Sequence, residues 1–172
     1  NTTASNNTAV GKDSLGANTT GTNHVAVGAN ALDANTTGTD NTAFGDEALA
    51  TVESGGNYNT AIGNDSLKDL TTGDKNTAIG RVAGANITTA SNNTIIGADA
   101  FFTNTTGASN VAIGSGTLNK NTTASYNTAV GSNAGSAVTT GIENTLIGSL
   151  AGDALTDADF NVAVGKSALP AD

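Results

Sequence analysis

The chain has 172 residues, a formal net charge of −9 and a Gly-rich composition that contains no cysteine, methionine or tryptophan. Fifteen acidic residues against six basic ones exclude the positively charged surface that binds nucleic acids or anionic membranes. No apolar run approaches the roughly 18 residues that a bilayer-spanning helix needs, so we expect no direct membrane insertion. The lack of cysteine excludes disulfides and thiolate metal sites.

A five-residue phrase, first seen as Asn7-Thr8-Ala9-Val10-Gly11, returns along the whole chain. Successive copies lie 17 residues apart, except for one interval of 18 residues. A short, regular period is typical of repeats that bury their apolar side by stacking on one another. We therefore predict that residues 1–172 form one all-β domain, a parallel β-roll or β-solenoid of about ten 17-residue coils. The recurrent glycines are Gly11, Gly28, Gly45, Gly63, Gly80, Gly97, Gly114, Gly131, Gly148 and Gly165.

The phrase predicts a short strand in each copy. We number each repeat from 1 to 17, with the recurrent glycine at position 5. Positions 2 and 4 hold β-branched or other apolar residues, and alternate residues of a strand share a face, so we predict that both positions face the core. Position 3 would then face outward, yet it is apolar in every copy, so we predict that it contacts a partner. The expected oligomer interface consists of Ala9, Ala26, Ala43, Ala61, Ala78, Ile95, Ala112, Ala129, Leu146 and Ala163.

Asparagine occupies position 1 in nine of the ten copies. We predict that its side-chain amide stacks between coils, and that the glycine at position 5 allows a positive φ or a close backbone approach. His24, the single histidine, replaces Asn in the second copy. We expect His24 to stand in structurally for Asn, without a role in catalysis or metal binding. The residues expected to form the turn and ladder include Asn7, Gly11, Asn41, Gly45, Asn76, Gly80, Asn127 and Gly131.

The rest of the repeat predicts the rest of the coil. A large residue at position 9 usually occurs with Asn at position 12, and Gly at position 9 occurs with an aliphatic residue at position 12, as Gly84 does with Ile87. Both positions are therefore expected to share one core. Thr-Thr pairs at positions 13 and 14 predict a second strand, with one Thr of each pair inside and one outside. The extra residue, near Gly55-Gly56, is expected to lengthen the return turn and leave the ladder unbroken.

The order Asn, β-branched residue, Ala, Ile or Val, Gly, followed by small-Leu and Asn-Thr-Thr-Gly, resembles the YadA-like head repeats of trimeric autotransporter adhesins. It is also similar to repeats of phage tail fibres and of large bacterial surface proteins. The resemblance covers nearly the whole chain. It implies a left-handed parallel β-roll, three copies of which associate around an axis. The 17-residue unit departs from the family pattern, since it is longer than the usual adhesin head repeat.

We therefore expect a structural and adhesive fibre segment, the head or shaft of a surface adhesin or of a phage tail fibre. It would act outside the cell, at a cell surface or on a virion. The expected partners are further copies of the chain, as a homotrimer that can also stack end to end, and a host-surface glycan or protein receptor bound through avidity.

Two other functions remain open from the sequence. An ice-binding solenoid is the alternative, because Thr columns on a regular coil can match a crystal lattice, although the Thr-Thr pairs offer one outward column. A polysaccharide-active β-helix is less favoured, because the acidic residues of position 7 are interrupted by uncharged residues in other copies. We expect no enzymatic activity, no metal site and no cofactor. The acidic residues of position 7 are Asp13, Glu47, Asp65 and Asp99.

Overall fold

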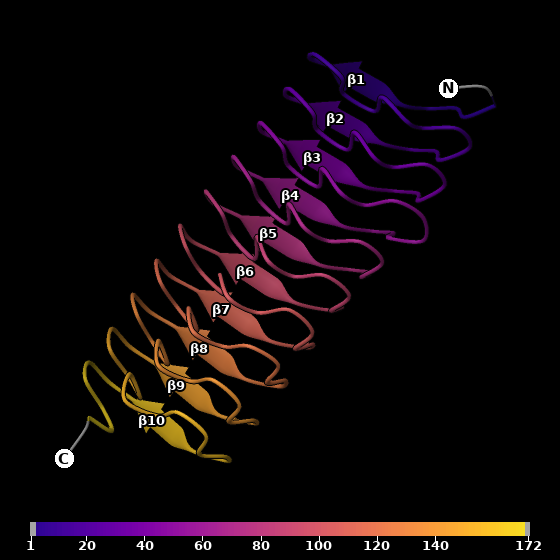
Figure 1. Cartoon of the computed structure of the whole chain (residues 1–172). Coiled ribbons are helices and arrows are strands. Elements are labelled where there is room, and N and C mark those ends of the chain that lie inside the picture. The colour runs from indigo at the N-terminus through magenta and orange to yellow at the C-terminus, as the bar shows by residue number, and fades with distance from the viewer. Residues whose placement is uncertain (1–2, 171–172) are drawn as a thin grey trace.

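Ten short parallel strands, one in each coil, stack into a single sheet in chain order (Figure 1). The computed structural model describes residues 3–170, which contain no helix and therefore no helix that could cross a membrane. Turns and bends complete each coil. The prediction of an all-β parallel solenoid with 17-residue coils is confirmed. The strands are β1 (Thr8–Val10), β2 (Val25–Val27), β3 (Thr42–Phe44), β4 (Thr60–Ile62), β5 (Thr77–Ile79), β6 (Thr94–Ile96), β7 (Val111–Ile113), β8 (Thr128–Val130), β9 (Thr145–Ile147) and β10 (Val162–Val164).

Each strand pairs with the next through residues at the same repeat position. Thr60 lies opposite Thr77, and the longer interval keeps this register because Thr42 lies opposite Thr60. Gly55, in the return turn of that longer coil, has a φ of 94°, and a Cβ placed on it would have no atom within 4 Å. The additional residue is accommodated on the surface, so the ladder is unbroken, as predicted.

The two faces of the strand are the reverse of the prediction. Position 3 points into the coil, since Ala61 and Ala78 are 0% exposed, whereas Ile62 and Ile79 at position 4 are 38% and 36% exposed. The predicted oligomer interface is therefore wrong, because side chains enclosed by their own chain cannot reach a partner. Small side chains suit position 3 because the inside of the coil is narrow. The residues concerned are Ala26, Ala43, Ala61, Ala78, Ile95, Ala112, Ala129, Leu146 and Ala163, all buried, and Ala9, which is exposed in the first coil.

Ile95 and Leu146, the two large side chains of position 3, fill space left by glycines at position 9. A Cβ on Gly84 would lie 2.8 Å from Ile95 Cδ1. A Cβ on Gly135 or on Gly152 would lie 2.7 Å from a terminal methyl of Leu146. Positions 9 and 12 share this core, as their inverse pairing predicted, and position 3 takes part in the same exchange of volume.

The Thr-Thr pairs do not form the predicted second strand. They lie in surface bends, and the second Thr of each pair is exposed, as Thr89 is. The hydroxyl of the first Thr donates to a backbone carbonyl of the next coil, as Thr71 Oγ1 does to the oxygen of Thr88 at 2.9 Å. The prediction of an inward-facing Thr is wrong because hydrogen bonds between coils, and not burial, hold this segment in place.

Candidate functional site

A ladder of asparagine side chains ties each coil to the next. The Oδ1 atom of Asn59 accepts a hydrogen bond from the backbone N–H of Asn76, at 2.9 Å. The Nδ2 group of Asn76 donates to the backbone oxygen of Ala90 in its own coil, also at 2.9 Å. Both side chains are fully buried, so the ladder satisfies polar groups that would otherwise destabilise the core. Four residues predicted for the ladder take part in such bonds: Asn7, Asn41, Asn76 and Asn127.

His24 occupies the ladder with the same pattern of contacts. Its Nδ1 atom accepts the backbone N–H of Asn41 at 3.2 Å, and its Nε2 atom lies 2.7 Å from the backbone oxygen of Gly38. A neutral ring that carries its proton on Nε2 satisfies both contacts. Burial disfavours the charged ring and lowers the pKa of His24, and hydrogen bonding to Gly38 opposes this effect only in part. His24 therefore fills the role of the asparagine, and its ring is enclosed within the coil stack.

The recurrent glycines allow the coils to approach closely at the end of each strand. Gly80 has a φ of 138°, and a Cβ on it would lie 2.6 Å from the backbone oxygen of Gly97. A side chain would thus meet strain in the backbone and a clash with the next coil. The same conformation occurs at Gly11, Gly45 and Gly131.

The side chains at positions 2 and 4 of β1–β10 form what we call the outer strand face. Position 4 presents apolar side chains to solvent along the sheet, with exposed fractions of 36% to 67% in six coils and half-buried side chains in the other four. Position 2 presents Thr or Val, which is half-buried in most coils. No copy places a charged residue at either position. A continuous, uncharged and partly apolar face of this kind is typical of an interaction surface.

The acidic residues of position 7 form ion pairs near the surface. Lys68 contacts Glu47 and lies 3.4 Å from Asp65, and Arg81 lies 2.9 Å from Asp99. The hydrogen bond from Lys68 lowers the pKa of Glu47 and raises that of Lys68. Within residues 3–170, no group of three histidine or acidic side chains is placed to hold a metal ion, and no pocket is found. The described part of the chain thus offers open surfaces for interaction.

Comparison of the chain with protein-family models, with curated proteins and with solved structures gives no match. The sequence predicted the asparagine ladder and the turn glycines, which lie directly before and directly after each strand, but it did not reveal the outer strand face. One signal could have identified that face: Ile95 and Leu146, the large residues of position 3, occur beside coils with glycine at position 9.

Proposed function

We propose that this chain is a structural and adhesive segment of an extracellular fibre, the head or shaft of a surface adhesin or of a phage tail fibre. In this proposal, copies of the chain associate side by side, as a homotrimer, through the outer strand face. The observation that carries the proposal is the apolar column at position 4, which runs along the whole sheet and stays in contact with water in a single chain.

The coil stack has the form expected of a fibre segment. At about 4.8 Å per strand, ten coils give a rod about 45 Å long. Each coil bonds to the next through the strand, the asparagine ladder and the Thr hydroxyls, so the rod is held together along its whole length. Figure 1 shows the strands aligned as successive rungs on one side of this rod. Such a rod can carry a binding surface at a distance from its base.

A further copy of the chain is the partner that fits the outer strand face best. Two chains that each carry a net charge of −9 repel one another, so association is favoured through a face without charged residues. Identical repeats also have the same spacing, so apolar side chains can interdigitate coil by coil. Burial of this column stabilises association by about 25 cal/mol for each Å² of apolar surface removed from water.

The resemblance to YadA-like head repeats supports the same assembly. That resemblance implies three copies around an axis and a left-handed roll. The resemblance rests on the repeated order of residues and does not depend on which strand face is buried. Positions 2 and 4 recur as regularly along the chain as position 3 does, so either face could form a repeated contact. Because position 3 is buried, we propose that the contact is made through positions 2 and 4.

Sedimentation equilibrium of the full chain tests the assembly. We expect a mass near three times the 16.7 kDa of one chain for the unmodified protein. The variant Ile62→Asp/Ile79→Asp should sediment as a monomer with an unchanged circular dichroism spectrum, because both side chains lie on the surface. Thr72→Asp/Thr89→Asp, which adds the same charges to exposed residues outside the strands, is the control and should stay trimeric. A monomeric unmodified chain would contradict the proposal.

The outer strand face also favours a second candidate, an ice-binding solenoid. Besides the exposed second Thr of each Thr-Thr pair, the chain carries the half-exposed Thr column of position 2, on a regular parallel sheet. Thr beside Ile or Val on evenly spaced strands offers methyl and hydroxyl groups in a lattice. Thermal hysteresis distinguishes the two functions: a monomer that depresses the freezing point supports ice binding, and a trimer without hysteresis supports the fibre.

A further inference from the structure

A second column of side chains lies at one corner of the coil, directly before the asparagine ladder. This corner column is formed by the residue directly before position 1 of each copy, and each of its residues has a φ between 57° and 63°. The left-handed conformation turns the chain sharply into the strand. The column consists of Asn6, Asn23, Asp40, Tyr58, Lys75, Asn92, Ser109, Tyr126, Glu143 and Phe160.

Three members of the corner column are aromatic and stand in water. The exposed fraction is 58% for Tyr58, 63% for Tyr126 and 68% for Phe160. A bulky residue is unfavourable in the left-handed region, whereas asparagine, present in three other coils, is well suited to it. These aromatic side chains lie outside the core, and large exposed apolar side chains that recur along one edge are typical of an interaction surface.

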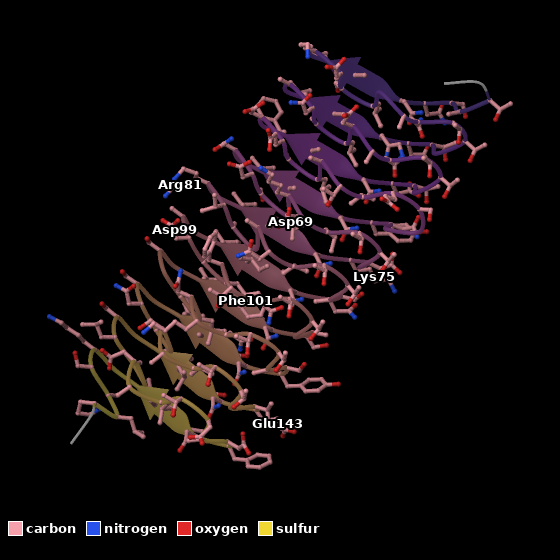
Figure 2. The ribbon with its side chains drawn as sticks, viewed as in Figure 1. Asp69, Lys75, Arg81, Asp99, Phe101 and Glu143 are labelled. Atoms are coloured by element: carbon pink, nitrogen blue, oxygen red, sulfur yellow. The ribbon has the colours of Figure 1, made fainter. Side chains whose placement is uncertain are left out.

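The aromatic side chains are regularly placed along the rod. They end the third, seventh and ninth repeats, so they are separated by four coils and by two, or by about 19 Å and about 10 Å. Polar residues occupy the coils between them, and Figure 2 shows Lys75 and Glu143 of the same column along one edge of the rod. Every separation is thus a multiple of two coils.

We propose that the corner column binds an extended, neutral, β-linked polysaccharide that lies along the rod. Sugar rings stack on the faces of Tyr58, Tyr126 and Phe160, which offer flat apolar surfaces. A β-1,4-linked chain presents the same ring face at every second sugar, and two sugars span about the length of two coils. Lys75, Asn92, Ser109 and Glu143 lie where they can donate to or accept from the hydroxyl groups between the stacked rings.

Charge and shape select this ligand over others. The net charge of −9 opposes an anionic polymer, so uronate or sulfated chains are disfavoured. With no pocket in residues 3–170, the ligand must lie on an open, straight surface, which suits an extended chain and not a coiled α-linked one. Aromatic rings that are about 10 Å or more apart, with polar residues between them, do not form the contiguous apolar core of a protein interface.

This inference rests on the proposed adhesive function and names the ligand class for it. Native affinity electrophoresis of the full chain tests it, with hydroxyethylcellulose cast in the gel as a neutral β-1,4-linked probe. Carboxymethylcellulose has the same backbone with added negative charge, and soluble starch is α-linked. We expect retardation by hydroxyethylcellulose, weaker retardation by carboxymethylcellulose and none by starch.

The variant Tyr126→Asn/Phe160→Asn removes two of the three rings and places asparagine where other coils already have it. It should fold as the unmodified chain does and bind hydroxyethylcellulose at least about tenfold more weakly. Thr72→Asn/Thr89→Asn is the matched control, because it places two asparagines at exposed residues outside both the corner column and the outer strand face, and it should bind normally.

Equal retardation of the double variant and the unmodified chain would overturn the proposal, as would no retardation of the unmodified chain by hydroxyethylcellulose. Equal retardation by starch would overturn the choice of a β-linked chain, and equal or stronger retardation by carboxymethylcellulose would overturn the choice of a neutral one. These outcomes do not affect the mass measured by sedimentation, so failure of glycan binding and failure of fibre assembly are distinguishable.

Discussion

Replacement of Leu146 by alanine tests which face of the strand is buried. Leu146 is 0% exposed, and its two terminal methyl groups lie against Gly135 and Gly152, which have no side chains that could move into the vacated space. Leu146→Ala should therefore reduce the free energy of unfolding by about 4 kcal/mol, in the upper half of the range for buried leucine. Ile147→Ala, one residue further on and 41% exposed, should cost about 0.5 kcal/mol.

The assay is urea denaturation followed by circular dichroism. Both substitutions are made in the Ile62→Asp/Ile79→Asp background, so that loss of association does not contribute to the difference. Amide hydrogen exchange in the eighth to tenth coils reports the local effect, because a stack of coils can open from one end without unfolding as a whole. A larger loss for Ile147→Ala than for Leu146→Ala would refute the inward assignment of position 3.

A second substitution tests whether side chains at repeat positions 3 and 9 fill the same space in the core. Gly135→Leu alone would clash with Leu146 and crowd Leu118, since a Cβ on Gly135 would lie 2.7 Å from Leu146 Cδ1 and 2.9 Å from Leu118 Cδ2. In the Leu146→Ala background the same leucine fills the space, as Leu118 does one coil earlier, where its φ is 48°. Gly135→Leu should thus restore part of the lost stability, with a coupling energy of about 1–3 kcal/mol. Additive losses would contradict a shared core.

The ladder and the turn glycine give two further predictions. His24→Asn restores the common ladder residue. Because burial lowers the pKa of His24, the unfolded chain takes up a proton near pH 6.5 and the folded chain does so only at lower pH. The original protein should therefore lose stability relative to the variant as the pH falls from 7 toward 5. Urea midpoints measured across this range check the effect, and parallel curves would refute it. Gly80→Ala should destabilise the chain by about 3 kcal/mol, through its positive φ and the contact with Gly97, whereas Gly55→Ala, which has a positive φ and no neighbour, should cost about 1 kcal/mol in the same urea assay. Similar losses for the two variants would show that the close approach of the coils does not matter.

The repeat made the architecture predictable from sequence, because a side chain in one coil has an equivalent directly above and below it. The period predicted the parallel pairing of Thr60 with Thr77, and the 18-residue interval predicted the surface turn at Gly55. Asparagine at position 1 predicted a ladder because few side chains can both donate and accept between strands. His24 followed from the same reasoning, since a neutral imidazole also offers one donor and one acceptor.

The orientation of the strand was not predictable from alternation alone. The β-branched and aromatic side chains of positions 2 and 4 are larger than the alanines that dominate position 3. The usual rule that large apolar residues lie inside therefore assigned positions 2 and 4 to the core. The coil is too narrow for that arrangement: Ala78 at position 3 is enclosed, and the interior is filled from position 9 by side chains such as Leu67. The corner column could not be predicted from the sequence either. Its side chains are exposed because the backbone turns in the left-handed conformation at residues such as Tyr126, and no sequence pattern at these residues signals that turn.

Cross-linking between chains tests the central claim, that copies meet through the outer strand face. The chain contains no cysteine, so Ile79→Cys introduces a single thiol on that face and Ala78→Cys introduces one inside the coil. Treatment of the folded proteins with a short bis-maleimide, followed by denaturing electrophoresis, reports which thiols meet. We expect covalent species of two chains from Ile79→Cys and monomer from Ala78→Cys. Monomer from Ile79→Cys, or cross-linked species from Ala78→Cys alone, would contradict the account.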